Sequence, residues 1–274
     1  MQITKTAPTK PPRIIIYGDH KVGKSTFGAS CPKPVFIQTE DGLESLGVDA
    51  FPLCRTFGDV MKQMDYLITQ PHEFKTMVLD SLDWCEKLIW ADICQKNNWS
   101  QLGEGSYGAG YKLAVNYWRE LLEKFDVLNR SRKMIIVLLA HAKVSKFEDP
   151  ERENYDKWDL DLHDRAGKLL LEYVDVIGYA CLKTAVITKK SGFGEVTKAK
   201  TTGERQLCLN AKAAYEAGNR YDLPDTLPLA WEPLSVAIKA TLAARKAPQA
   251  NNLEVIAKAR EEAKAANARQ EVAA

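Results

Sequence analysis

The stretch RIIIYGDHKVGKST, from Arg13 to Thr26, decides the fold of this 274-residue chain. It opens with a short β-branched run, which is typical of a buried parallel strand. The residues that follow, GDHKVGKS from Gly18 to Ser25, match the pattern G-x-x-x-x-G-K-[ST]. A helix is expected to begin at Ser25. A strand, a glycine-bounded loop and a helix in this order predict a phosphate-binding loop within an α/β domain.

Each part of this loop has a chemical role. The glycines let the backbone curl so that consecutive N–H groups face the phosphates, and the helix N-terminus adds a favourable dipole. Lys24 is expected to reach the β- and γ-phosphates, and the Ser25 hydroxyl to ligate Mg²⁺. We therefore expect ATP, or a closely related nucleoside triphosphate, to bind with Mg²⁺ at Gly18, Asp19, His20, Lys21, Val22, Gly23, Lys24, Ser25 and Thr26.

Beyond the loop, apolar runs alternate with segments of helical spacing. Strands are predicted at 35–37, 76–80, 134–140, 174–182 and 184–189, helices at 57–69, 83–97 and 113–128, and a hairpin at 189–209. Strands that alternate with helices predict an α/β fold with a mostly parallel sheet, covered by helices on both faces. In such a sheet the ligand lies at the carboxyl edge of the strands.

Asp80 ends the strand-like run TMVLD at this edge. A carboxylate in that place can hold the metal ion through water. The alternative is a helix N-cap, because Asp is favoured immediately before a helix. Together with the phosphate loop, Asp80 is predicted to share the metal with Ser25.

Hydrolysis needs a group that orients or deprotonates water beside the γ-phosphate. Glu40 follows the second predicted strand and is the candidate general base. Asp41 and Glu44 compete for this role, and an ordinary turn carboxylate is the other alternative. His141 ends the fourth predicted strand and is either a sensor that hydrogen-bonds the γ-phosphate or a purely structural residue.

The order of these motifs resembles the RecA-like ATPase core. VFIQTEDGLE (35–44) is similar to the second strand and catalytic glutamate of recombinases, TMVLDS (76–81) to their metal-binding strand, and IIVLLAH (135–141) to their sensor strand. More closely, the chain resembles compact RecA-like ATPases of phages, including the Sak-type single-strand annealing recombinases. That likeness is carried by YGAGYK (107–112), LLAHAKV (138–144), LLEYVDVIGYA (170–180) and AGNRYDLPDTLP (217–228).

Composition predicts a flexible lead-in at 1–12, which is polar with three prolines, and an Ala/Lys/Glu-rich helical or disordered tail at 236–274. Between them, the resemblance implies a RecA-like P-loop core at 13–235. It also implies ATP hydrolysis coupled to single-stranded DNA in recombination, annealing or repair. The expected partners are single-stranded DNA, further copies of the chain in a ring or filament, and a single-strand-binding protein.

In such assemblies a neighbouring subunit inserts a basic residue beside the γ-phosphate. Arg205 and Arg220 are the candidates here, with Lys212 third. The related pattern in RecA-like repair proteins is Lys-Asn-Arg, but this chain has Gly218-Asn219-Arg220. The lysine is missing, which weakens the prediction of a role for that segment in a neighbouring site.

Three segments are candidates for a DNA surface. Trp99 to Lys112 offers glycines and aromatic side chains that either stack on bases or pack onto the domain. The hairpin offers Lys183, Lys189, Lys190, Lys198, Lys200 and Arg205, which either bind phosphates or are a solvated sheet edge. Residues 146–165 carry eight carboxylates against four basic side chains, which disfavours a phosphate backbone and suits a protein contact instead.

The composition is consistent with a cytoplasmic protein. The net charge is +2, with 45% apolar and 27% charged residues, and the six cysteines show no zinc spacing. Neither a signal peptide nor an apolar run long enough to span a bilayer is recognisable, so no membrane partner is expected.

Two other functions compete with the ATPase acting on DNA. One is a small-molecule P-loop kinase, in which the acidic segment 146–165 would be a lid over the phosphates. The other is an adaptor, similar to helicase loaders, whose nucleotide controls assembly. Hydrolysis stimulated by DNA would separate the first function from both alternatives.

Overall fold

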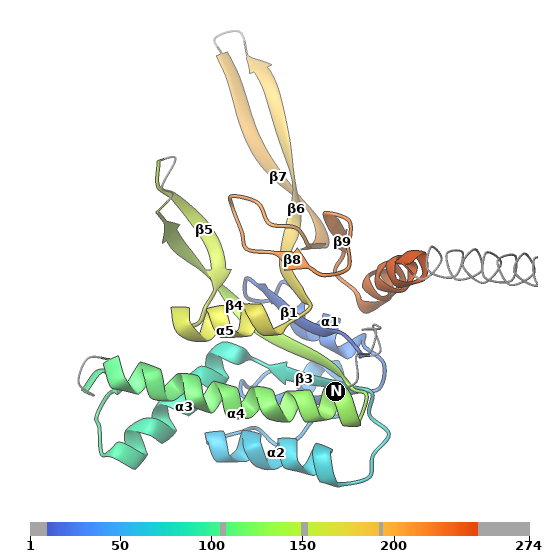
Figure 1. Ribbon diagram of the computed structural model, residues 1–274. Coiled ribbons are helices and arrows are strands. Elements are labelled where there is room, and N and C mark those ends of the chain that lie inside the picture. The colour runs from blue at the N-terminus through green and yellow to red at the C-terminus, as the bar shows by residue number, and fades with distance from the viewer. Residues whose placement is uncertain (1–9, 105–107, 149–152, 192–193, 246–274) are drawn as a thin grey trace, which may run out of the picture.

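The computed structural model describes residues 10–104, 108–148, 153–191 and 194–245, and within the hairpin the side chains of 184–201 are not described (Figure 1). The centre of the fold is a parallel sheet whose strands lie in the order β2-β3-β4-β1-β6. Their bounds are β1 (Arg13–Gly18), β2 (Pro34–Gln38), β3 (Thr76–Asp80), β4 (Ile135–Phe147) and β6 (Val176–Ser191).

Antiparallel strands extend this sheet at one side. β7 (Gly194–Cys208) pairs with β6 and with β9 (Thr226–Pro228), while β8 (Gly218–Asn219) pairs with the beginning of β6. β5 (Tyr155–Leu160) pairs with the distal part of β4. Two hairpins thus project from the domain, the β4–β5 arm and the β6–β7 arm (Figure 1).

Helices cover both faces of the sheet. One face carries α2 (Phe57–Thr69), α3 (Leu82–Asn97), α4 (Ala109–Ser131) and α5 (Asp164–Tyr173), and the other carries α1 (Lys24–Ala29) and a helix at 231–245. Short 3-10 helices lie at Glu44–Leu46 and Leu102–Glu104. The predicted fold class, an α/β RecA-like core with a mostly parallel sheet and flanking helices, is confirmed.

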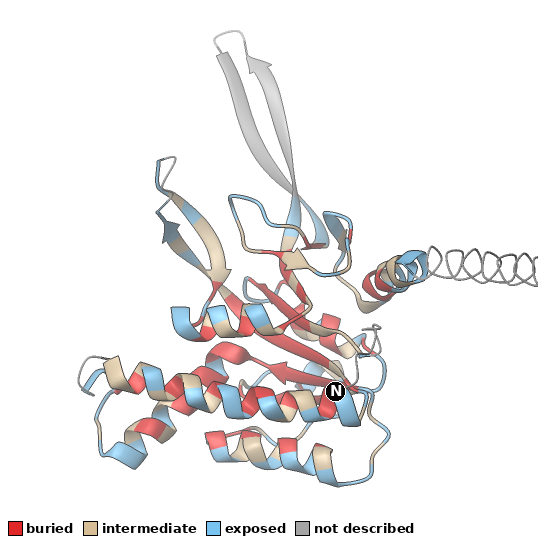
Figure 2. Cartoon of the chain, in the orientation of Figure 1, coloured by how far each residue is buried: buried red, intermediate tan, exposed pale blue. Residues whose placement is uncertain are grey.

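Alternate side chains of β1 point to opposite faces of the sheet, and both faces are buried. Ile15 and Tyr17 pack into the core under α2 to α5, whereas Ile14 and Ile16 pack into the core under α1 and the 231–245 helix. All four side chains are fully buried. Burial of one such side chain contributes about 1.5–3 kcal/mol. Figure 2 shows buried residues concentrated in the central sheet and on the helix faces that cover it.

The helix α2 and the strand β3 have the bounds that the sequence predicted. α2 begins with a capping box, in which the Thr56 hydroxyl accepts from the Asp59 backbone N–H and the Asp59 carboxylate accepts from that of Thr56.

Other boundaries were predicted wrongly. α4 begins at Ala109, so part of the glycine-rich stretch 99–112 is helical. The strand predicted at 134–140 is longer than expected, because β4 continues to Phe147 and pairs with β5, a strand that was not predicted. α5 was not predicted, and the segments 174–182 and 184–189 form one strand with an irregular register between Leu182 and Thr184.

The helix at 231–245 runs through the domain boundary expected between residues 235 and 236. Leu234 and Ile238 are buried in the core on the α1 face. Ordered structure packed on the domain therefore continues past that boundary. The expected lead-in up to residue 9 and the tail from residue 246 lie outside the described residues. Within the described part of the chain, the helices are too short or too polar to cross a membrane.

Candidate functional site

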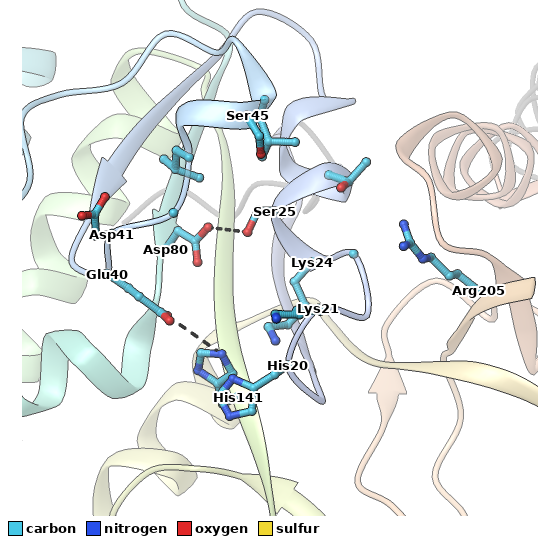
Figure 3. A pocket seen from close by; sticks show the side chains of 15 residues that line it. His20, Lys21, Lys24, Ser25, Glu40, Asp41, Ser45, Asp80, His141 and Arg205 are labelled. Atoms are coloured by element: carbon cyan, nitrogen blue, oxygen red, sulfur yellow. Dashed lines mark hydrogen bonds and ion pairs between the residues drawn. The ribbon is translucent and has the colours of Figure 1, made fainter. Parts of the chain in front are cut away.

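A cavity of about 370 Å³ lies at the carboxyl edge of the parallel strands (Figure 3). The residues that line the cavity lie together because of the strand register, in which Gly18 pairs with His141 and Gln38 pairs with Asp80. β1, β2 and β3 therefore end at one edge, where β4 passes them at His141 and continues to Phe147. The lining residues are His20, Lys21, Gly23, Lys24, Ser25, Thr26, Glu40, Asp41, Gly42, Leu43, Ser45, Leu46, Asp80, His141 and Arg205.

The phosphate loop turns sharply at Gly23, whose φ of 108° lies in the left-handed region that favours glycine. α1 begins at the next residue. The first glycine is needed for a different reason, because a Cβ on Gly18 would lie 2.3 Å from the carbonyl oxygen of Ala180 on β6. Gly18 is therefore required for strand packing, and together with Asp19 and Val22 it does not line the cavity.

Lys24 is a buried cation, only 7% exposed. Its Nζ donates to the carbonyl oxygens of Gly18 at 3.1 Å and Asp19 at 2.9 Å. Burial lowers the pKa of Lys24, and nearby carboxylates, first among them Asp80, oppose that shift. Among the described residues no carboxylate lies within 4.0 Å of the ammonium. A buried charge whose partners are neutral carbonyls favours an anionic ligand.

Ser25 and Asp80 form the candidate metal position. The Ser25 hydroxyl donates to Asp80 Oδ2 at 2.7 Å (Figure 3), and burial raises the pKa of Asp80. Asp80 is not the N-cap of α3, since Ser81 occupies that position. The described residues contain no group of three or more acidic, His or Cys side chains that would hold a metal by themselves. Two oxygen donors suit Mg²⁺, which keeps waters and binds substrate phosphates.

Glu40 and His141 face each other across the cavity. The Nε2 atom of His141 lies 3.9 Å from Glu40 Oε2 (Figure 3), and the Ser81 hydroxyl lies 3.4 Å from the same oxygen. The ring of His141 also lies against His20, with 4.1 Å between ring centroids. The candidate base and the candidate sensor are therefore held next to the phosphate loop.

Asp83 fixes the orientation of His141 from behind. Its Oδ2 lies 2.9 Å from Nδ1 of His141, and its Oδ1 accepts from the backbone N–H of His141 at 3.1 Å. Burial raises the pKa of Asp83, but the hydrogen bonds and electrostatic attraction of His141, together with a hydrogen bond from Ser81, outweigh burial and lower this pKa overall. An ionised Asp83 requires Nδ1 to carry a proton, which leaves Nε2 directed at Glu40.

Sequence reasoning missed Asp83 and the segment Gly42–Leu46, which lines the cavity opposite the phosphate loop. The spacing of Asp83, three residues after Asp80 in the first turn of α3, was the available signal. Of the alternatives to Glu40, Asp41 lines the cavity and Glu44 does not.

The two arginines expected to act in a neighbouring site lie at opposite edges of the sheet. Arg220 pairs with Asp175 at 3.2 Å and donates to the carbonyl oxygen of Glu172, beside the amino end of β1. Arg205 projects from β7 into the cavity of its own chain (Figure 3). Lys212, the third candidate, is exposed and makes a short bridge with Tyr215.

Aromatic side chains of the glycine-rich stretch pack onto the domain. Trp99 is partly buried against the core, and Tyr111 stacks on His163 with ring centroids 4.3 Å apart. The packing alternative therefore holds for both, while Tyr107 lies outside the described residues. In the hairpin, Lys183 pairs with Glu204 on an exposed surface, and the side chains of Lys189, Lys190, Lys198 and Lys200 lie outside the described set.

Three comparisons place the chain among known proteins. A family model described as "AAA domain" matches residues 10–221. The SPbeta prophage-derived uncharacterized protein YorG of Bacillus subtilis (strain 168) is 25% identical over 152 residues, which cover 53% of this chain and 44% of that protein. The chain thus spans less than half of YorG. The crystal structure of the RadB recombinase matches 73% of this chain and 80% of its own, with 13% identity and a TM-score of 0.41, too low to support an argument.

Proposed function

The chain belongs to the AAA-domain family, and from this premise we propose that it is a Mg²⁺-dependent ATPase acting on single-stranded DNA in phage-type recombination, annealing or repair. The observation that carries the proposal is the convergence of Lys24, the Ser25–Asp80 pair and the Glu40–His141 pair on one cavity. These are a cation, two oxygen donors and a candidate base, which phosphoryl transfer to water requires.

Nucleotide binding begins with Lys24. When phosphates enter, its ammonium exchanges the carbonyl oxygens of Gly18 and Asp19 for phosphate oxygens, which compensate a charge that the protein leaves unpaired. Ser25 and Asp80 would hold Mg²⁺, which supplies charge neutralisation on the β- and γ-phosphate oxygens.

Glu40 accepts a proton from the attacking water in this proposal. Nε2 of His141 lies 3.9 Å from Glu40 Oε2, and Asp83 fixes the ring so that Nε2 faces Glu40. The presence of a γ-phosphate then determines which group His141 contacts. His141 is thereby suited to report the nucleotide state to the remainder of β4, which continues beyond the cavity into the β4–β5 arm.

The DNA part of the proposal rests on the resemblance to phage recombinases and on the word "prophage-derived" in the name of YorG. It also agrees with the β6–β7 arm, which projects beyond the rest of the domain (Figure 1). Assembly into a ring or filament belongs to the same proposal. The kinase alternative loses support, because the described residues of 146–165 line no part of the cavity.

The test is steady-state ATP hydrolysis with and without single-stranded DNA, at low salt, with double-stranded DNA as a comparison. Stimulation by single-stranded DNA, lost in Lys24→Ala, supports the proposal. Turnover that ignores DNA, together with oligomerisation that depends on nucleotide, would instead identify the adaptor. Transfer of phosphate to a small acceptor in place of water would identify the kinase.

A further inference from the structure

Arg205 stands beside the phosphate loop of its own chain. A Cβ built on Gly23 would lie 3.0 Å from Nη1 of Arg205 and 3.5 Å from its Cζ. The guanidinium therefore occupies the space over the glycine where any other residue would place its side chain. Arg205 lines the same cavity as Lys24, Ser25 and Thr26, and reaches it from the side opposite Glu40 (Figure 3).

Strand pairing fixes this position without a neighbouring chain. β6 lies next to β1, and the phosphate loop begins against it, at the contact between Gly18 and the Ala180 carbonyl oxygen. β7 pairs with β6, so that Arg205 lies opposite Leu182 at the base of the β6–β7 arm. β9 holds β7 from its other side. The backbone of Arg205 is thus anchored two strands away from the loop.

Within the described part of the chain, the exposed guanidinium of Arg205 makes no hydrogen bond or ion pair. It lines the same cavity as the buried Lys24, whose ammonium donates to two backbone carbonyl oxygens. Arg220 differs, because Asp175 and the Glu172 carbonyl oxygen already engage its guanidinium. Lys24 and Arg205 are two cations that line one cavity, which favours an anionic ligand there, and a guanidinium suits phosphate oxygens in particular.

We propose that Arg205 binds the phosphate chain of the nucleotide held by its own chain, and so ties the base of the β6–β7 arm to that nucleotide. The inference rests on the nucleotide site of the proposed function, but not on its DNA part. It replaces the expectation that Arg205 enters the site of a neighbour. A complete set of phosphate-binding cations then exists within one chain.

Mixing two defective variants shows whether Arg205 acts on the nucleotide of its own chain or on that of a neighbouring chain. Arg205→Ala chains lack the guanidinium, and Lys24→Ala chains lack the loop cation. If Arg205 serves its own chain, neither variant contains a complete site, and an equimolar mixture hydrolyses ATP no faster than the two variants do separately. If Arg205 serves a neighbour, mixed assemblies contain complete sites, and recovery of hydrolysis on mixing overturns the proposal.

Binding gives a readout that does not depend on turnover or on DNA. Titration of a fluorescent ATP analogue is carried out at protein concentrations where light scattering shows single chains. Arg205→Ala should weaken binding by about 10- to 100-fold, the loss expected for charged hydrogen bonds, and Arg205→Lys should restore part of it. Arg220→Ala removes the same charge at the opposite edge of the sheet and should leave binding unchanged.

The outcomes are distinguishable from failure of the proposed function. Unchanged binding in Arg205→Ala overturns the inference, as does a wild-type chain that binds no nucleotide. Weakened binding in Arg205→Ala supports it even if DNA never stimulates hydrolysis, in which case only the DNA part of the proposed function falls.

Discussion

Replacement of Asp83 by asparagine tests whether the orientation of His141 matters for hydrolysis. The side chain of Asp83 is 6% exposed and holds His141 through two contacts, at 2.9 Å to Nδ1 and 3.1 Å to the backbone nitrogen. The new amide can keep the backbone contact. Its NH₂ group, however, donates where the carboxylate accepted, so Nδ1 of His141 can no longer donate to residue 83, and the charged hydrogen bond that fixes the ring is lost.

The size of the effect follows from the bond that is lost. A hydrogen bond to a charged group contributes about 1.5–3 kcal/mol, which corresponds to a fall in kcat of about 10- to 100-fold. Asp83 does not line the phosphate cavity, so binding of an ATP analogue should change by less than about threefold, a difference smaller than about 0.7 kcal/mol. The assay is steady-state hydrolysis, which gives kcat, together with a separate binding titration.

Asp92→Asn is the matched control, because Asp92 lies on the same helix and pairs with Lys96 away from the cavity. It should leave kcat unchanged. An Asp83→Asn protein with wild-type kcat would refute the argument that Asp83 positions the sensor. Thermal unfolding of both variants separates a loss of stability from a loss of chemistry.

Three further predictions follow from single contacts. Glu40→Gln should keep ATP binding and lose hydrolysis, measured by the same two assays, and full turnover would exclude Glu40 as the base. Gly18→Ala should lower the free energy of unfolding by about 1–3 kcal/mol, because the new Cβ would lie 2.3 Å from the Ala180 carbonyl oxygen. Denaturant titration measures this change. Gly167→Ala, which has open space around the new Cβ, is the control. Burial raises the pKa of Glu86 from 4.5 to about 7, so its contribution to stability is complete below pH 4.5 and is lost as the pH rises through about 7. Glu86→Gln should therefore reduce the fall in stability over that pH range, by at most about 3 kcal/mol, and an unchanged pH profile would contradict the assignment.

The sequence predicted those parts of the site that depend on neighbours along the chain. The phosphate loop carries its own pattern, and Asp80 and His141 end apolar runs whose strand character is plain. Asp83 was missed, and Arg205 was predicted to act in a neighbouring site, because their contacts are distant along the chain: Asp83 meets His141 58 residues away, and Arg205 reaches Gly23 across β6. No local spacing encodes such contacts.

The errors in the fold have a similar origin. α5 follows a run of charged residues, and only Ala166 and Leu170 of its ten residues are fully buried, so its amphipathic pattern is short. β4 continues past the apolar run because β5 supplies hydrogen bonds to it, while Val144 and Phe147 stay largely exposed. The β-strand propensity of the residues does not reveal a strand that is stabilised mainly by the neighbouring strand with which it pairs.

The continuity of β4 has a mechanical consequence. His141 and Phe147 belong to one unbroken strand, and an extended chain advances about 3.3 Å per residue, so roughly 20 Å of stiff backbone separates them. β6 and β7 form a second such element, with Arg205 at its root. Both arms begin at the cavity, so a small rotation of an arm's base on phosphate binding would displace its far end by a larger distance. A molecule bound at that far end would then move when the nucleotide changes.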